Sequence, residues 1–264
     1  MQTKLLPDIK DTPLGQEADE ILRRCVHCGF CTATCPTYQI LGDELDSPRG
    51  RIYLIKEMLE GSEVTASTQL HLDRCLTCRN CETTCPSGVE YGKLIDIGRQ
   101  IVDERVPRSK TDKIKRVGLR KVLNAPWFSQ AYKLGQSVRQ WLPESIQRKV
   151  VAKQTPGVVP TNRGQTRQVI MLNGCVQPGM MPNIDAATIR ILDKLDIGAR
   201  TVAESGCCGA LNFHLDAHEA GRAQMRANID AWWPQVEQGA EAIVQTASGC
   251  GAFVKEYGEM LKDD

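Results

Sequence analysis

The sequence predicts an α+β protein made of two parts, a helical N-terminal domain and a small α/β domain with a parallel sheet. Three observations support this. Apolar residues recur at helical spacing in the first hundred residues, and no strand pattern interrupts them. A cysteine-rich run occurs twice within this helical part. Further on, short apolar strands alternate with helical stretches, which is typical of parallel strands joined by crossover helices. We expect a helical domain at 1–106, a basic helical and linker segment at 107–166, and the α/β domain at 167–264.

The first domain is predicted to place helices before, between and after the cysteine-rich runs. The expected helices lie at residues 17–24, from Pro48 to near Gly61, at 67–73, and around Ile95 and Ile101. Ser47 suits an N-cap and Pro48 the first helical position, because proline has no N–H to donate there. Residues 1–13 contain two prolines and mixed charge, and we expect them to be a mobile lead-in.

The two cysteine-rich runs have identical spacing. Cys25–Pro36 and Cys75–Pro86 both read C-x2-C-x2-C-x3-C-P, the pattern of bacterial proteins that bind two iron–sulfur clusters. Three thiolates two residues apart can face three corners of one cube of iron and sulfide. A fourth cysteine one helical turn further lies about 6 Å along the axis and can reach a second cube. Zinc is the alternative, but it usually takes two separated C-x2-C pairs.

We therefore expect two [4Fe–4S] clusters with exchanged fourth ligands. The predicted ligands of the first cluster are Cys25, Cys28, Cys31 and Cys85. Those of the second are Cys75, Cys78, Cys81 and Cys35. His27 and Phe30 lie in the first run, whereas Arg79, Asn80 and Glu82 lie in the second, so we expect unequal reduction potentials.

The second domain is predicted to bring cysteines to one edge of its sheet. The expected strands are 167–172, 199–203 and 242–246, with helices at 183–195 and at 215–233, the latter stopped by Pro234, and a last helix that carries Phe253 and Tyr257. The strands are followed by Cys175, by the Cys207-Cys208 pair and by Cys250. Ligands bind at the carboxyl edge of such sheets, so these thiols are a candidate third redox site. The alternative is that they are small buried apolar side chains.

Three other features of the sequence give weaker evidence about function. The pair of His214 and His218, spaced i, i+4 on an expected helix, is interpreted as facing solvent. The basic stretch 107–122 fits a solvated helix face, or a surface that docks an acidic partner or anionic lipid. We find no dinucleotide or phosphate-binding glycine motif, no HExxH and no acid/base pair, so no catalytic residue is predicted.

Composition narrows the protein class and its compartment. The chain has 264 residues, 41% of them hydrophobic and 25% charged, with a net charge of +1, which gives no reason to expect a nucleic-acid partner. Metal-binding cysteines must be thiolates, which indicates a reducing compartment. No signal peptide and no apolar run of about 18 residues is present, so we expect a cytoplasmic protein that associates with the inner membrane at most peripherally.

Four stretches carry a resemblance to a known family. They are Cys25–Tyr38, Asp73–Gly88, Asn228–Pro234 and Gln245–Gly258. Together with Cys207-Cys208-Gly209, they resemble the heterodisulfide-reductase type of pairing, in which a helical ferredoxin domain precedes cysteine-rich CCG domains. Within that type, the chain is most similar to the iron–sulfur subunits of bacterial glycolate oxidases.

The resemblance implies an electron-transfer subunit of a complex that oxidises glycolate to glyoxylate. FAD and substrate would be bound by partner subunits, and a quinone or another carrier would accept the electrons. The alternatives are an equivalent subunit for glycerol-3-phosphate or lactate oxidation and a non-catalytic assembly subunit. The sequence departs from the family in two places, since Phe253 replaces the last CCG cysteine and the second CCG copy is missing, as in a fragment or shortened product.

Overall fold

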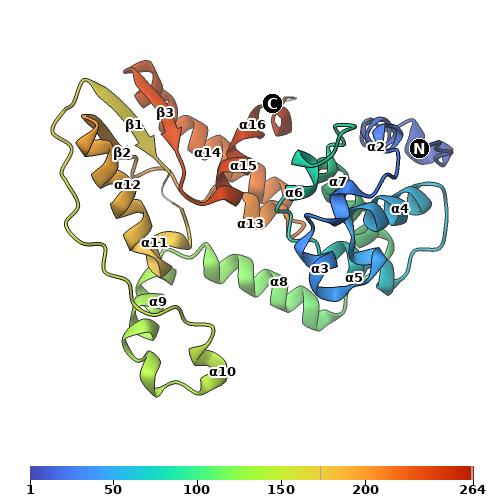
Figure 1. The fold of residues 1–264 in the computed structure, drawn as a ribbon, viewed down its shortest axis with the longest axis horizontal. Helices are drawn as coiled ribbons and strands as arrows, with labels where there is room; N and C mark the ends of the chain where they lie inside the picture. The colour runs from blue at the N-terminus through green and yellow to red at the C-terminus, as the bar shows by residue number, and fades with distance from the viewer. Residues whose placement is uncertain (173, 263) are drawn as a thin grey trace. The chain divides into compact units, whose positions relative to one another are not determined.

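The computed structural model describes residues 1–172, 174–262 and 264, which form two compact units, Met1–Lys110 and Thr111–Asp264 (Figure 1). Asn173, expected in the turn before Cys175, lies outside the described residues. The predicted fold class is confirmed, because the chain is mostly helical and carries a small three-stranded parallel sheet in its second unit.

The first unit is helical around two cysteine-rich loops. Its elements are α1 (Pro7–Lys10), α2 (Pro13–Arg24), η1 (Phe30–Thr32), α3 (Pro36–Leu41), η2 (Glu44–Asp46), α4 (Pro48–Leu59), α5 (Ala66–Asp73), α6 (Asn80–Thr83) and α7 (Tyr91–Arg105). Helices α2, α4, α5 and α7 pack on one another and enclose the core. Leu22, Ile55, Leu72 and Leu94 have no exposed side-chain surface, and burying them is the main stabilising contribution of this unit.

The cap at Ser47 is confirmed, whereas the mobile lead-in is wrong. Ser47 Oγ accepts a hydrogen bond of 2.9 Å from Gly50 N–H at the start of α4. The lead-in instead forms α1, and the Leu6 N–H donates to the Leu59 carbonyl over 3.0 Å. Both prolines of this segment occupy first helical positions, where the missing N–H costs nothing.

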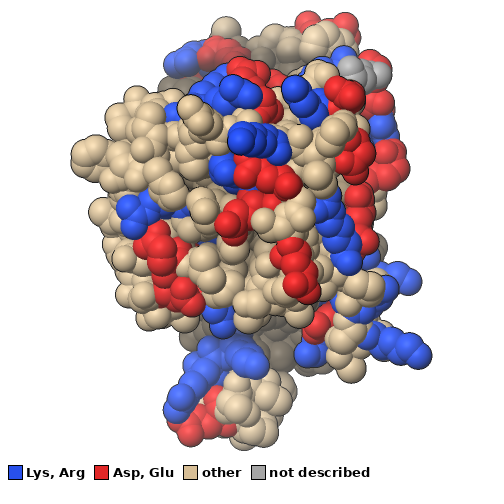
Figure 2. All heavy atoms as spheres, turned by 90° about the vertical axis from the view of Figure 1, so that its right-hand side faces the viewer, with Lys and Arg blue, Asp and Glu red and all other residues tan. Residues whose placement is uncertain are grey.

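The second unit begins with helices that precede its sheet. They are α8 (Lys110–Leu123), α9 (Phe128–Ser137), η3 (Arg139–Trp141) and α10 (Glu144–Gln147). No residue of α8 is buried and its lysines are exposed, whereas the Arg116 side chain is 19% exposed and pairs with Asp216 over 2.6 Å. Residues 151–165 contain no helix or strand, as predicted for a linker. On the face drawn in Figure 2, acidic and basic side chains are interspersed.

The sheet is parallel and has the order β2-β1-β3. Its strands are β1 (Arg167–Met171), β2 (Ile197–Thr201) and β3 (Ala240–Val244). The register pairs Arg167 with Ile197 and Val169 with Ala242. Strands β2 and β3 start two residues earlier than expected. The cause is the residue before each strand, since Asp196 and Gly239 adopt positive φ (58° and 94°) and turn the chain directly into the strand.

The remaining helices cover and follow the strands. They are α11 (Gln177–Met180), α12 (Pro182–Lys194), α13 (Ala210–Phe213), α14 (His218–Glu237), α15 (Ser248–Lys255) and α16 (Tyr257–Met260). Helix α12 packs on β2 and α14 on β3. The prediction that Pro234 stops the helix is wrong. It lies in the last turn of α14, where the helix continues because the Pro234 carbonyl accepts from Gln238 N–H over 3.2 Å.

Helix length and apolarity bear on membrane insertion. Within the described residues, no helix is both long and apolar enough to cross a bilayer.

Candidate metal centres

The two cysteine-rich loops share one backbone conformation. His27 and Gly29 have φ of 58° and 85°, and the equivalent Thr77 and Arg79 have φ of 51° and 58°. In each loop the N–H two residues after the first cysteine points at that cysteine's sulfur. The His27 N–H bonds to Cys25, and Thr77 N–H lies 3.4 Å from Cys75 Sγ. In each loop, residues with positive φ alternate with residues of ordinary backbone conformation. This alternation turns successive backbone N–H groups toward the inside of the loop, where they can stabilise a negatively charged cluster.

The first predicted ligand set is brought together in the first unit. Burial, followed by the neighbouring Cys85 and Cys28, raises the pKa of the Cys25 thiol. Burial and Cys25 raise the pKa of Cys31 to about 11. Cys85, from the second run, therefore lies among the thiols of the first run.

The second predicted set surrounds a pocket. Cys35, Cys75, Cys78 and Cys81 line this pocket together with Arg51, Thr37 and Tyr91. Cys35 belongs to the first run and stands at the N-cap of α3, which carries it over to the other loop. The Arg99 guanidinium anchors this loop by donating to the Cys75 carbonyl over 2.7 Å.

The donor chemistry fits an iron–sulfur cluster at each set. Burial and the neighbouring Cys75 raise the pKa of the Cys81 thiol. Such closely packed thiols cannot all ionise without cations among them, and iron supplies the opposing charge. Both sets offer four sulfur atoms, the ligand set that [4Fe–4S] clusters use.

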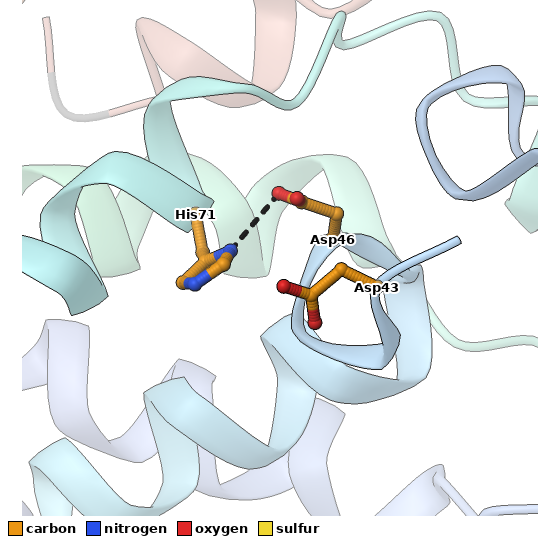
Figure 3. Close-up of side chains that lie close together, drawn as sticks. All are labelled: Asp43, Asp46 and His71. Carbon is orange, nitrogen blue, oxygen red and sulfur yellow. Dashed lines mark hydrogen bonds and ion pairs between the residues drawn. The ribbon is translucent and has the colours of Figure 1, made fainter. Parts of the chain in front are cut away.

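Beside the second set lies a buried ionic network whose members the sequence does not identify. The Asp46 carboxylate is fully buried and interacts with Arg51, His71 and Arg74 over 3.3, 3.1 and 2.8 Å. Figure 3 shows His71 pointing at Asp46, with Asp43 nearby. Although Asp43, Asp46 and His71 have metal-ligand chemistry, two guanidinium groups already hold Asp46, and Asp43 Oδ1 accepts from Leu45 N–H over 2.9 Å. The group is therefore a structural ion-pair network.

The cysteines of the second unit converge as predicted from the strand ends. Hydrogen bonds link the thiols of Cys175, Cys207, Cys208 and Cys250 in series. The hydrogen bond from Cys175 and then that from Cys208 lower the pKa of Cys207. Gly209 follows with φ of 93°, and a Cβ there would lie 2.8 Å from the Gly221 carbonyl oxygen. Only glycine fits this close approach.

Phe253 stands at the position where the CCG pattern has its last cysteine. Its ring belongs to a cluster of aromatic side chains. Its side chain is 2% exposed, and its ring centroid lies 5.5 Å from Phe213 and 5.4 Å from His214. The interpretation of His214 and His218 as a solvent-facing pair on one helix is wrong. His214 follows α13 while His218 starts α14, because Asp216 (φ 62°) breaks the helix between them, and the His218 ring packs 4.5 Å from Phe213.

Asn228 and Tyr257 brace the Cys207-Cys208 segment. Asn228 Nδ2 donates to the Cys207 carbonyl over 2.9 Å, and its Oδ1 accepts from Gly206 N–H over 2.8 Å. The Tyr257 hydroxyl donates to the Cys208 carbonyl over 2.6 Å. The sequence did not single out either residue for this role, since an Asn within a helix pattern is usually a surface residue.

Replacing Asn228 by Ala is expected to destabilise the second unit by about 2–3 kcal/mol, because buried backbone groups lose their partners. Urea unfolding of the full chain, followed by tryptophan fluorescence, measures the loss, because Trp232 is buried in the same unit. Asn212→Ala is the matched control, since Asn212 is only half-buried and bonds to the Gln224 side chain. Equal losses in the two variants would contradict the bracing role.

Comparisons with known proteins agree with this arrangement. A model of the 4Fe-4S dicluster domain matches residues 21–89, and a model of the cysteine-rich domain matches residues 169–255. We found no significant match among solved structures.

Three curated proteins are similar in sequence. The glycolate oxidase iron-sulfur subunit of Escherichia coli is 58% identical over 100% of this chain and 65% of its own length. The probable glycolate oxidase iron-sulfur subunit of Bacillus subtilis is 31% identical over 92% of this chain and 60% of its own. Lactate utilization protein A of Bacillus pumilus is 27% identical over 34% of this chain and 36% of its own. The chain thus spans less than two thirds of the relatives it matches. It carries a 4Fe-4S dicluster domain followed by a cysteine-rich domain, and over its whole length it is similar to glycolate oxidase iron–sulfur subunits.

Proposed function

We propose that this chain is the iron–sulfur subunit of a glycolate oxidase complex. It binds two [4Fe–4S] clusters and conducts electrons from FAD on partner subunits to a quinone or another acceptor while glycolate is oxidised to glyoxylate. The similarity to glycolate oxidase iron–sulfur subunits supports the substrate. The arrangement of the cysteines supports the role.

The observation that carries the proposal is the exchange of cysteines between the two loops. Cys85 lies beside Cys25, and Cys35 lines the pocket of the second loop. Cys31 of the first set also lies close enough to Cys81 of the second to raise the pKa of its thiol. Two clusters held by these thiols would be neighbours. When bound, such clusters accept and release single electrons.

The cysteine loops also reach the surface, where electrons can enter and leave. Cys28 and Cys78 are exposed, one in each loop. The apolar side chains of Val26, Phe30 and Leu76 flank them and are 66%, 62% and 62% exposed. A partner subunit docked there would cover these apolar groups and exclude water.

We assign the oxidation of the substrate itself to the partner subunits that carry FAD. We propose no catalytic residue in this chain, because the pattern of cysteine sites suits conduction and a flavin would take the hydride. The four thiols of the second unit remain a candidate third redox site. Iron counting separates the possibilities, since two clusters require about eight irons per chain and a further cluster requires more.

The test combines this chain with its partners. Co-expression with the FAD subunits, followed by anaerobic purification, is expected to give brown complexes that reduce an artificial electron acceptor when glycolate is added. Partner subunits without this chain are the control and are expected to transfer few electrons to a quinone analogue. Binding of clusters without any glycolate-dependent transfer would contradict the proposal and favour an assembly role.

Lactate oxidation is the second candidate, because part of the chain is similar to lactate utilization protein A. The same complex is therefore assayed with lactate and with glycerol-3-phosphate. Faster reduction with either of them than with glycolate would replace the proposed substrate but leave the electron-transfer role intact.

A further inference from the structure

The side chain of Arg51 is a buried positive charge in the wall of the second cysteine pocket. It is only 1% exposed, although arginine is rarely buried without a partner. It lines the same pocket as Cys35, Cys75, Cys78 and Cys81. Its helix, α4, starts at the Ser47 cap, so the backbone that carries Arg51 is firmly positioned.

Arg51 shares its carboxylate partner with a second arginine. Nε donates to the His71 carbonyl over 2.7 Å, and Nη1 donates to Thr37 Oγ1 over 3.1 Å. Its carboxylate partner among the described residues is Asp46, which lies 3.3 Å from Nη2. Asp46 also pairs with Arg74 at the shorter distance of 2.8 Å. One carboxylate is thus shared by two guanidinium groups, Arg51 and Arg74.

The sulfurs of the second cysteine set share a pocket with Arg51. Thr37 Oγ1 accepts from Arg51 and lies 3.2 Å from Cys35 Sγ. The Thr37 hydroxyl donates its one hydrogen to the Asp46 carbonyl over 3.0 Å, so it takes no defined role toward Cys35. The Tyr91 hydroxyl lies 3.5 Å from Cys75 Sγ and donates to it. Arg51 therefore acts on this sulfur set through space, from the wall of the same pocket.

We propose that Arg51 sets the reduction potential of the cluster held by this second set of cysteines and makes that cluster easier to reduce. The inference rests on the cluster assignment of the proposed function. Reduction adds one electron, and hence one negative charge, to a buried group. A nearby buried cation stabilises the more negative state, since screening is weak inside the protein. Charges and hydrogen bonds around the ligands are known to tune such sites.

The test is a redox titration of the full chain after anaerobic cluster reconstitution, followed by EPR, with iron counted for each variant. Arg51→Gln is expected to lower one of the two midpoint potentials by about 59 mV or more, a tenfold change for one electron, and to leave the other unchanged. Arg51→Lys retains the charge and is expected to keep most of the potential. Arg105→Gln is the matched control, because Arg105 belongs to the same unit but donates to the Met58 carbonyl over 2.8 Å.

The outcomes separate the inference from the proposed function. Unchanged midpoints in Arg51→Gln at full iron content would overturn the inference, as would equal shifts in the Gln and Lys variants. If Arg51→Gln loses one cluster, Arg51→Lys decides, since a normal potential supports the inference and a lost cluster overturns it. A wild-type chain that binds no pair of clusters would instead refute the proposed function.

Discussion

Replacing Cys28 and Cys85 together is expected to remove one cluster, whereas replacing Cys28 and Cys35 together removes both. In the exchanged arrangement Cys28 and Cys85 serve the same cluster, so the second substitution adds little to the first. Cys28 and Cys35 serve different clusters, so their effects add. Alanine is the replacement of choice because it has no ligand atom.

Iron counting and EPR after anaerobic reconstitution measure the outcome. The double variant that lacks Cys28 and Cys85 is expected to keep about four of about eight irons. The double variant that lacks Cys28 and Cys35 is expected to keep almost none. The single variants are the controls, and each is expected to lose one cluster. If each loop held its own cluster, the two double variants would exchange their results, and the proposed exchange of ligands would be wrong.

The sequence pattern was enough to predict which cysteines lie together in the structure. The spacing within each run defines a loop that can present three sulfurs, and the α/β pattern places Cys175, Cys207 and Cys250 at one sheet edge. Strand starts were missed by two residues, because Asp196 adopts a left-handed turn that its residue type does not require. Pro234 was read as a helix stop, but a proline in a last turn costs only one hydrogen bond near a helix end.

The surroundings of the second cysteine set could not be predicted, because they depend on contacts between distant segments. Thr37, Asp46 and His71 meet Arg51 from three different elements. One signal was present in the sequence. Arg51 stands four residues before Ile55 and seven before Met58, so it occupies the apolar stripe of α4. A charged residue in such a stripe indicates a buried partner, but it does not identify that partner.

Replacing Asp46 by Asn is expected to lower the free energy of unfolding of the first unit by about 3–5 kcal/mol. The substitution keeps the size of the side chain and removes its charge. Arg51 then loses its carboxylate partner inside the protein, and His71 and the half-exposed Arg74 lose their shared partner. Burying an unpaired charge costs far more than losing an exposed pair, because water no longer solvates it.

Urea unfolding of the anaerobic, cluster-loaded chain, followed by circular dichroism, measures this loss at equal iron content. Asp19→Asn is the matched control, because Asp19 pairs over 2.8 Å with an Arg23 side chain that is 57% exposed. Pairs of that kind contribute less than about 1 kcal/mol. If Asp46→Asn cost no more than Asp19→Asn, the Asp46 carboxylate would not be what holds Arg51 beside the cysteines. The orientation of that guanidinium would then depend on Thr37 and the His71 carbonyl alone.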